Sequence, residues 1–376
     1  ADVRGQVTPG VLSPLFRSSR LARSWIDLAA MLDPAALPAQ LTARGRDDWL
    51  GIYQLATAEL IAPALHAKLA AHGRLSTLPE DMRSALELLW ERNDQRNQRL
   101  LRLLLETARI LNAAGIEPLL LKGAIALLPG QYPYAFARMM SDLDIGVPDA
   151  DCERAAEALS AQGYFHPPPY DPLTHAGDYH LAPLCHPDET VGTIEIHRRL
   201  LPPWLATHVL AFDKVLAKAW RCELDGVVVR IPAHEDRLLH NALHQEMYPS
   251  AFSAVDRSLR QLLEFVQLRD VPDAVDMDWV AILEQLDADG RGDLLRTVLL
   301  AASRLFAQPV PPGVRLPPAV VGAEDLFWRR LRSPMLDRYY RVGAGIMLLA
   351  RAVPRFVTDP MWRYRVYRIL RYNWIG

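Results

Sequence analysis

Short strand-like runs are confined to the middle of this chain, between residues 117 and 231, and stretches with helical spacing lie on both sides of them. Residues 117–122 form an apolar run that ends at Gly123, which predicts a buried strand, a turn and then a short helix. Residues 141–147 alternate polar and apolar side chains and end at Pro148, which predicts a second strand. The pattern therefore predicts an α+β fold in which a small mixed β-sheet lies between helical flanks.

Two further pairs of runs have the signature of β-hairpins. Residues 178–186 and 192–200 flank a turn that begins with a Pro-Asp pair. Residues 221–224 and 227–231 lie on either side of an Asp-Gly pair, which favours a tight two-residue turn. Both hairpins would add strands to the same central region of the chain.

The remaining segments are predicted to be helical. Apolar side chains recur at helical spacing over 47–72, 79–115 and 149–163, and each of these stretches ends at a glycine. Helical patterns also dominate from residue 233 onward. We therefore expect three units: an N-terminal helical region at 1–78, a core at 79–233 and a C-terminal helical domain at 234–376.

Composition excludes several classes of protein. The 42 basic and 44 acidic residues nearly cancel, so no overall positive field attracts nucleic acid and no stable DNA binding is expected. The three cysteines are widely spaced and form no CxxC pair, which argues against a disulfide framework and a cysteine zinc site. No apolar run approaches the roughly 18 residues of a membrane span. We expect a cytoplasmic protein without a transmembrane segment.

Three acidic residues are the strongest candidates for chemistry. Residues two apart on a strand share a face, so Asp142 and Asp144 project to the same side, opposite two apolar neighbours. The same rule places Glu195 and His197 on one face of the run at 193–197. If these two strands are neighbours, the three carboxylates converge on one patch.

Three ionised carboxylates in one patch repel one another, so the arrangement needs a cation. Oxygen ligands of this kind suit Mg²⁺ or Mn²⁺. Such ions complete their coordination with water and substrate phosphates, which indicates chemistry on a nucleoside triphosphate. Gly123 after the apolar strand would let backbone N–H groups approach phosphate oxygens, and Lys122 and Arg138 could neutralise the triphosphate.

These motifs bring a family resemblance into view. LLLKGAIAL at 119–127, RMMSDLDIGVP at 138–148, a helix that ends in QGY and TIEIH at 193–197 follow one another in this order. In this combination the chain resembles the uncharacterised bacterial nucleotidyltransferase family of the DNA polymerase beta superfamily, over roughly residues 90 to 245.

The resemblance implies a nucleotidyltransferase core in which Asp142 and Asp144 hold metal ions. Glu195 stands where the superfamily usually has its third acid, which helps to activate the acceptor hydroxyl. The implied reaction moves an NMP unit from an NTP, with ATP as the expected donor, to an acceptor and releases pyrophosphate. We predict Lys122, Gly123, Arg138 and Ser141 as nucleotide-binding residues. The acceptor stays open among a small molecule, a peptide or protein, and RNA.

Two alternatives follow from other features. The superfamily commonly has Gly-Ser or Gly-Gly at the turn where this chain has Gly123-Ala124, so a catalytically silent nucleotide-binding or interaction protein on the same fold is the second hypothesis. The third rests on residues 339–376, where arginines alternate with aromatic side chains. This composition suits an RNA or membrane surface, but arginines on the solvated side of a packed helix produce the same pattern.

Two histidines are candidate substrate contacts. His197 either hydrogen-bonds an acid or touches substrate, and the structural role is the preferred interpretation. His180 lies in a segment that lacks the tight spacing of zinc ligands, so we expect a surface or substrate-loop role.

Overall fold

The structure is a computed structural model and describes residues 20–33, 45–134, 136–167, 178–188, 192–244, 257–270, 277–306 and 308–340. Helices α1 (Arg20–Leu32), α2 (Arg46–Ala58) and α3 (Ala62–Ala71) precede the long helix α4 (Glu80–Ala113). The central elements are β1 (Leu119–Leu120), α5 (Gly123–Ala126), β2 (Asp142–Gly146), α6 (Cys152–Ser160), β3 (Leu184–Cys185), β4 (Thr193–His197), α7 (Phe212–Lys218), β5 (Trp220–Leu224) and β6 (Val227–Ile231). Helices α8 (His234–His244), α9 (Leu259–Arg269), α10 (Trp279–Ala288), α11 (Gly292–Leu305) and α12 (Pro318–Arg332) follow.

The described strands form one mixed sheet of six strands in the order β3-β4-β2-β1-β6-β5. Strands β2 and β4 pair in parallel, with Asp144 directly opposite Glu195. The β5–β6 pair is antiparallel, and Asp225 and Gly226 both have positive φ at its turn, at 48° and 74°. Those dihedrals suit a two-residue turn that follows the twist of the strands. This sheet between helices confirms the predicted α+β fold class.

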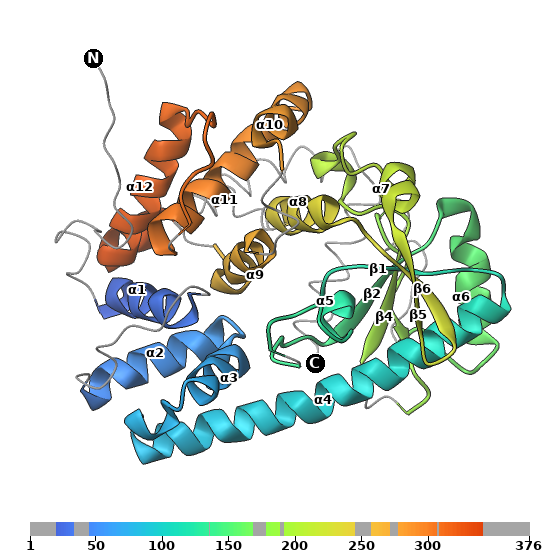
Figure 1. Cartoon of the computed structure of the whole chain (residues 1–376), viewed down its shortest axis with the longest axis horizontal. Coiled ribbons are helices and arrows are strands. Elements are labelled where there is room, and N and C mark those ends of the chain that lie inside the picture. The colour runs from blue at the N-terminus through green and yellow to red at the C-terminus, as the bar shows by residue number, and fades with distance from the viewer. Residues whose placement is uncertain are drawn as a thin grey trace.

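Figure 1 shows the sheet on one side of the molecule and most of the helices on the other. The long helix α4 runs along both halves, from α3 at one end to the sheet and α6 at the other. Helices α8 and α9 lie between the sheet and the outer helices α10 to α12 (Figure 1). These two helices are therefore the part of the C-terminal region that faces the sheet.

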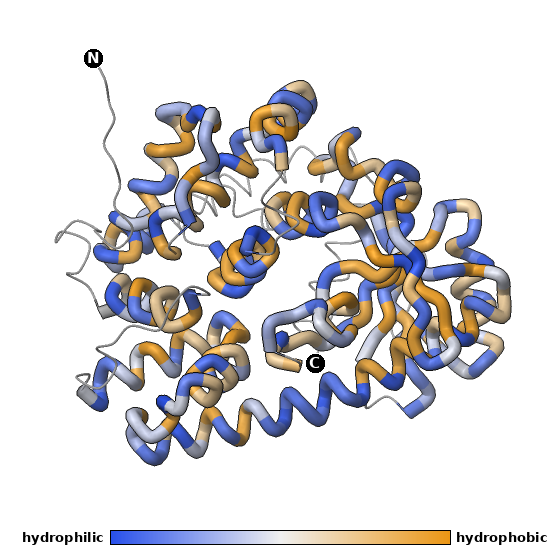
Figure 2. The backbone as a smooth tube through the Cα atoms, viewed as in Figure 1, coloured by the Kyte–Doolittle hydropathy of each residue, from blue (hydrophilic) through white to orange (hydrophobic). Residues whose placement is uncertain are grey.

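The buried apolar residues fall into two clusters. One cluster joins α4, α5 and α6 to the sheet and includes Leu143, Ile145, Ile194 and Ile196. The other joins α1, α2 and α3 to the helices from α8 to α12. Figure 2 shows the strands as largely hydrophobic, whereas the middle of α4 is mostly hydrophilic. The N-terminal and C-terminal helices thus share one core, while the predicted division at 78 and 233 stays a prediction.

The segment 47–72, which is predicted to be helical, consists of two helices: α2 ends at Ala58 and α3 begins at Ala62. Leu60 has a positive φ of 58° at the break. The N–H of Ile61 bonds the carbonyl of Ala56, and the N–H of Leu60 bonds that of Thr57. This is the hydrogen-bond pattern of a Schellman cap, which usually has glycine at the left-handed position. Because leucine takes the place of glycine here, no stop signal marks this break in the sequence.

The other predicted elements agree with the structure. The helix over 79–115, both strands that carry the candidate residues and both hairpins are present. The helices expected after residue 233 are confirmed for the described residues, whereas residues 341–376, most of the arginine-rich and aromatic-rich segment, lie outside them. None of the described helices combines the length and the apolar composition needed to cross a membrane.

Candidate active site

Two adjacent parallel strands bring the predicted acids together. Asp142 and Asp144 lie on β2, and Glu195 lies directly opposite Asp144 on β4. The intervening Leu143 and Ile145 are fully buried in the core below the sheet. Burial of these apolar residues fixes which face of β2 carries the carboxylates, because a one-residue slip would reverse every side chain.

Asp144 is the most tightly held of the three acids and is only 4% exposed. Its Oδ1 accepts hydrogen bonds from Lys122 Nζ at 2.7 Å and from His197 Nε2 at 2.8 Å. Burial alone raises the pKa of Asp144, but the charge of Lys122 and the hydrogen bond from His197 outweigh it and hold that pKa well below its usual range. Asp144 is therefore ionised in the folded protein.

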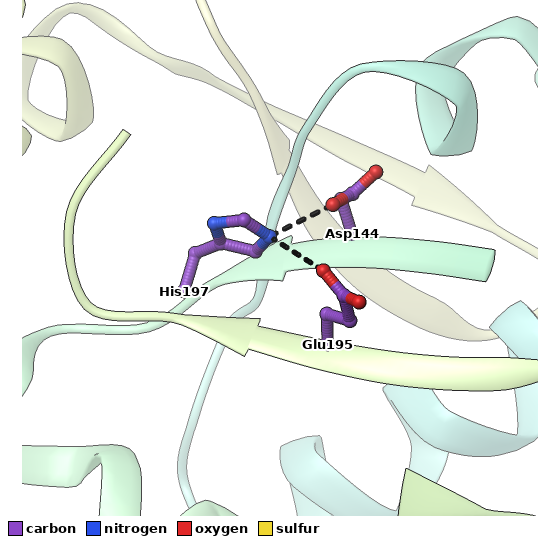
Figure 3. A group of neighbouring side chains, drawn as sticks. All are labelled: Asp144, Glu195 and His197. Atoms are coloured by element: carbon purple, nitrogen blue, oxygen red, sulfur yellow. Dashed lines mark hydrogen bonds and ion pairs between the residues drawn. The ribbon is translucent and has the colours of Figure 1, made fainter. Parts of the chain in front are cut away.

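His197 lies beside the carboxylates of Asp144 and Glu195 and contacts both of them through one ring nitrogen (Figure 3). Its ring is completely buried, and Nε2 lies 3.7 Å from Glu195 Oε2 as well as 2.8 Å from Asp144 Oδ1. Burial lowers the pKa of His197, but the two carboxylates raise it more, so the net shift is upward. The imidazole thus orients both acids and donates a hydrogen bond to Asp144.

Asp142 differs from Asp144 in its electrostatic surroundings. Burial, then the negative charges of Asp144 and Glu195, raise the pKa of Asp142. Burial also raises the pKa of Glu195, but the nearby His197 outweighs it and the net shift is downward. Of the three acids, Asp142 is the one whose ionised form is disfavoured. A bound cation would therefore stabilise the ionised form of Asp142 most.

The donor atoms fit a divalent ion. One ligand atom each from Asp144, Glu195 and His197 lie within 4.8 Å of one another. Since His197 Nε2 already hydrogen-bonds Asp144, the carboxylate oxygens are the donors that stay available. Oxygen donors of this kind suit Mg²⁺ or Mn²⁺ better than a thiolate-binding metal.

These acids face a cavity of about 640 Å³ between the sheet and helices α8 and α9. A volume of this size is in the usual range for small-molecule sites, roughly 300 to 1,000 Å³. Of the residues predicted for the site, those that line the cavity are Lys122, Arg138, Asp142, Asp144, His180 and Glu195. The cavity thus gathers candidates that lie far apart in the sequence.

Lys122 and Arg138 both line this cavity, but each is already paired with an acid. Lys122 contacts Asp144 and has a positive φ of 46°, which is costly for a residue other than glycine. Arg138 donates from Nε to Glu264 Oε1 at 2.8 Å and from Nη2 to Oε2 at 3.4 Å. The positive charges of both residues are therefore largely balanced within the protein.

Gly123 and Ser141 are not among the residues that line this cavity, and the nucleotide contact predicted for them stays a prediction. Gly123 is buried, and a Cβ atom added there would lie 2.2 Å from Arg138 Nη1. A larger residue at this position would therefore displace the Arg138 side chain. Ser141 precedes β2, is exposed and is not among the cavity-lining residues.

The two candidate histidines occupy different positions. His197 lies under the acids, in agreement with the preferred structural interpretation, and does not line the cavity. His180 lines the cavity, and its Nε2 lies 3.9 Å from Glu195 Oε2. His180 also forms an isolated β-bridge with His197, which holds this segment beside β4. The direct substrate contact predicted for His180 stays a prediction.

Sequence reasoning missed the wall of the cavity that α8 and α9 supply. Cavity residues on these helices include Arg237, His240, Asn241, His244, Arg260 and Glu264. On α8 they follow i, i+3, i+4 and i+7 spacing, which places them on one helix face. The row of polar side chains at this spacing is the signal that the sequence offers. His240 also contacts the rest of the protein, since its Nε2 donates to the carbonyl of Leu200 at 3.0 Å.

Comparisons with known proteins bear on this geometry. The model of a family described as "uncharacterised nucleotidyltransferase" matches residues 45–307, which is more than half of the chain. No curated protein and no solved structure gave a match. The matched range contains all three acids, both strands that carry them and helices α8 and α9. With acids from two paired strands at one cavity and a family match across both halves of the site, this chain belongs to the uncharacterised nucleotidyltransferase family.

Proposed function

We propose that this protein is a divalent-metal-dependent nucleotidyltransferase that transfers an NMP unit from an NTP to an acceptor. A nucleophilic oxygen of the acceptor would attack the α-phosphorus, and the bond between that phosphorus and the oxygen bridging to the β-phosphate would break. Pyrophosphate leaves with the electron pair of that bond, and the acceptor loses its proton. ATP is the proposed donor, and the acceptor is a small molecule, a peptide or protein, or RNA.

One observation carries this proposal: the parallel pairing of β2 and β4 sets Asp144 opposite Glu195, with Asp142 on the same face of β2. All three side chains line one cavity of small-molecule size. Phosphoryl transfer depends mainly on positioning and charge neutralisation, so a rigid pair of strands is a suitable support.

Each acid has a proposed role. Asp142 and Asp144 would hold Mg²⁺ or Mn²⁺, and Glu195 would complete the site or accept the proton of the acceptor. The metal ion, when bound, supplies charge neutralisation at the phosphates. His197 is a positioning residue that keeps Asp144 and Glu195 together, because its Nε2 lies within 4 Å of both carboxylates. Lys122 and Arg138, with Gly123 and Ser141, remain the proposed nucleotide-binding set.

The test is the release of pyrophosphate and the transfer of label from each α-labelled NTP, with Mg²⁺ or Mn²⁺ and a cell extract as the source of acceptor. Asp142→Asn and Asp144→Asn should each lower turnover, by roughly 100-fold or more, since each removes charge that stabilises the transition state. Glu157→Gln, at an exposed position on α6, is the matched control and should leave turnover unchanged.

Two results would contradict the proposal. Normal NTP consumption by Asp142→Asn would exclude this residue from the catalytic site. Binding of ATP with Mg²⁺ by the wild-type protein, without pyrophosphate release from any NTP, would favour the catalytically silent nucleotide-binding protein instead.

A further inference from the structure

Among the cationic side chains that line the cavity, Arg237 on α8 is the one whose charge nothing nearby balances, for the part of the chain that the structure describes. Lys122 pairs with Asp144, and Arg138 pairs with Glu264. Arg260 lies close enough to Glu59 to lower the pKa of that acid. No described carboxylate lies within ion-pair distance of Arg237.

The surroundings of Arg237 leave most of its donors available. Its Nη1 donates to Gln131 Oε1 at 2.8 Å, and Gln131 also lines the cavity. A guanidinium group has five N–H donors, so one neutral amide does not satisfy it. Burial lowers the pKa of Arg237 to about 10, and no carboxylate offsets this effect. A partly desolvated cation of this kind favours a bound anion.

Arg237 and the acids of the sheet line the same cavity. His240 is three residues further on α8, on the same helix face, and lines the same cavity. Burial lowers the pKa of His240 to about 3, and the charges of Lys122, His197 and Asp144 also act on it. The α8 face that carries Arg237 therefore continues, within one helical turn, to the acidic cluster.

We propose that Arg237 binds the β- and γ-phosphates of the nucleotide, so that the C-terminal helical region supplies the phosphate-binding cation of the site. The proposal rests on the proposed function for the identity of the anion. It differs from the sequence-based expectation because Lys122 and Arg138, the predicted phosphate ligands, already pair with carboxylates. In this proposal Arg237 binds the phosphates that leave as pyrophosphate and takes no part in proton transfer.

The test is calorimetric binding of inorganic pyrophosphate, and separately of ATP with Mg²⁺, to the full chain. Arg237→Met should weaken the binding of both by roughly 10-fold to 100-fold, the range expected for hydrogen bonds to a charged group. Arg237→Lys should recover part of the loss because it keeps the charge. In turnover assays, Arg237→Met should raise the KM for the NTP more than it lowers kcat.

Arg269→Met is the matched control. Arg269 is also a desolvated arginine of the helical region, and burial likewise lowers its pKa to about 10. It donates to the carbonyl of Pro309 and lies over the Trp279 ring, away from the cavity-lining set. Loss of its charge should leave pyrophosphate affinity unchanged, and circular dichroism should verify that all variants fold.

Three results would overturn the proposal. The first is wild-type affinity for pyrophosphate in Arg237→Met, or no affinity in the wild-type protein. The second is an equal loss in Arg237→Met and Arg269→Met, which would indicate a general structural effect. The third is unchanged ATP binding by Arg237→Met together with a raised KM for the acceptor, which would indicate that Arg237 binds an anionic group of the acceptor instead. Pyrophosphate binding through Arg237 without turnover of any NTP would instead contradict the proposed function and support this inference.

Discussion

At the residue scale, folding shifts the pKa values of the two aspartates of β2 in opposite directions, although only one residue separates them. Asp144 is neutralised by Lys122 and hydrogen-bonded by His197, so its ionised form stabilises the native state. Asp142 has a raised pKa, through burial and then the charges of its two acidic neighbours, so its ionised form opposes folding. A site that binds cations would hold one acid in place and leave the other in need of a counter-charge.

We therefore predict opposite stability changes for two isosteric substitutions, measured by urea denaturation with a chelator present. Asp142→Asn should raise the free energy of unfolding near neutral pH, because it removes a charge that the fold disfavours. Asp144→Asn should lower it by roughly 3 to 5 kcal/mol, because it leaves the Lys122 ammonium unpaired.

The effect of Asp142→Asn on stability should depend on pH. The pKa of Asp142 is raised in the folded protein, so its stabilising contribution is present below the ordinary value of 3.8 and is lost as the pH rises through the folded value. The gain in Asp142→Asn should accordingly disappear in acid. Without the chelator, Mg²⁺ should raise the melting temperature of the wild-type protein but not of Asp142→Asn. A lower free energy of unfolding for Asp142→Asn near neutral pH would contradict the electrostatic interpretation.

At the element scale, helix α4 holds the segment that carries Arg138. Asn97 Nδ2 donates to the carbonyls of Phe136 and Arg138, at 2.8 and 2.7 Å, and Asn93 Nδ2 reaches the Phe136 carbonyl at 2.6 Å. Phe136 has a positive φ of 58°, which is unfavourable for an aromatic residue. These side chains satisfy backbone groups that lie outside any helix or strand, and so fix the path of the chain into β2.

We predict that Asn97→Ala lowers the free energy of unfolding by about 1 to 3 kcal/mol, because it takes a donor from two carbonyl groups. The same change should weaken ATP binding, since Arg138 and the start of β2 lose their support. Urea denaturation and calorimetry measure the two effects. Gln98→Ala is the control on the same helix. Gln98 is exposed and, among the residues that the structure describes, its side chain bonds only Asp94. The free energy of unfolding and the ATP affinity of this variant should therefore stay near those of the wild type. Equal effects of the two substitutions would refute the anchoring role.

At the scale of the whole molecule, helices from the two ends of the chain form one body. Trp25 on α1 contacts Phe327 on α12 edge to face, with ring centroids 5.5 Å apart and the planes at 81°. Both side chains are almost completely buried in the cluster that also contains α8 and α9. The helices that supply one wall of the cavity are therefore supported by residues from the N-terminal region.

We predict energetic coupling between these two aromatic residues. Trp25→Leu and Phe327→Leu should each lower the free energy of unfolding. In the double variant, the decrease should be about 0.5 to 1.5 kcal/mol smaller than the sum of the two single decreases. Urea denaturation of the four proteins measures the coupling. Val229→Ala is the control partner, since Val229 lies in the cluster around the sheet and should combine with Trp25→Leu additively, within about 0.5 kcal/mol. Additive effects for Trp25 and Phe327 would mean that the two ends of the chain do not form one body.

The sequence by itself determined the local elements and the face that carries the acids. The alternation around Asp142 and Asp144, the Asp-Gly turn and the long helix over 79–115 depend on residues close together in the chain, where periodicity and turn chemistry act directly. The break between α2 and α3 lacks the glycine that usually marks a helix end, because leucine occupies the left-handed cap position of α2.

Only the tertiary structure decided which of these side chains meet. The pairing of Arg138 with Glu264, the burial of His197 beneath two carboxylates and the exposure of Arg237 to the cavity each join segments far apart in the chain. Such contacts depend on how α8 and α9 pack over the sheet, and packing is set by the burial of apolar surface across the whole molecule. No local pattern encodes that arrangement, and therefore the acids could be predicted from the sequence whereas the partners of the basic residues could not.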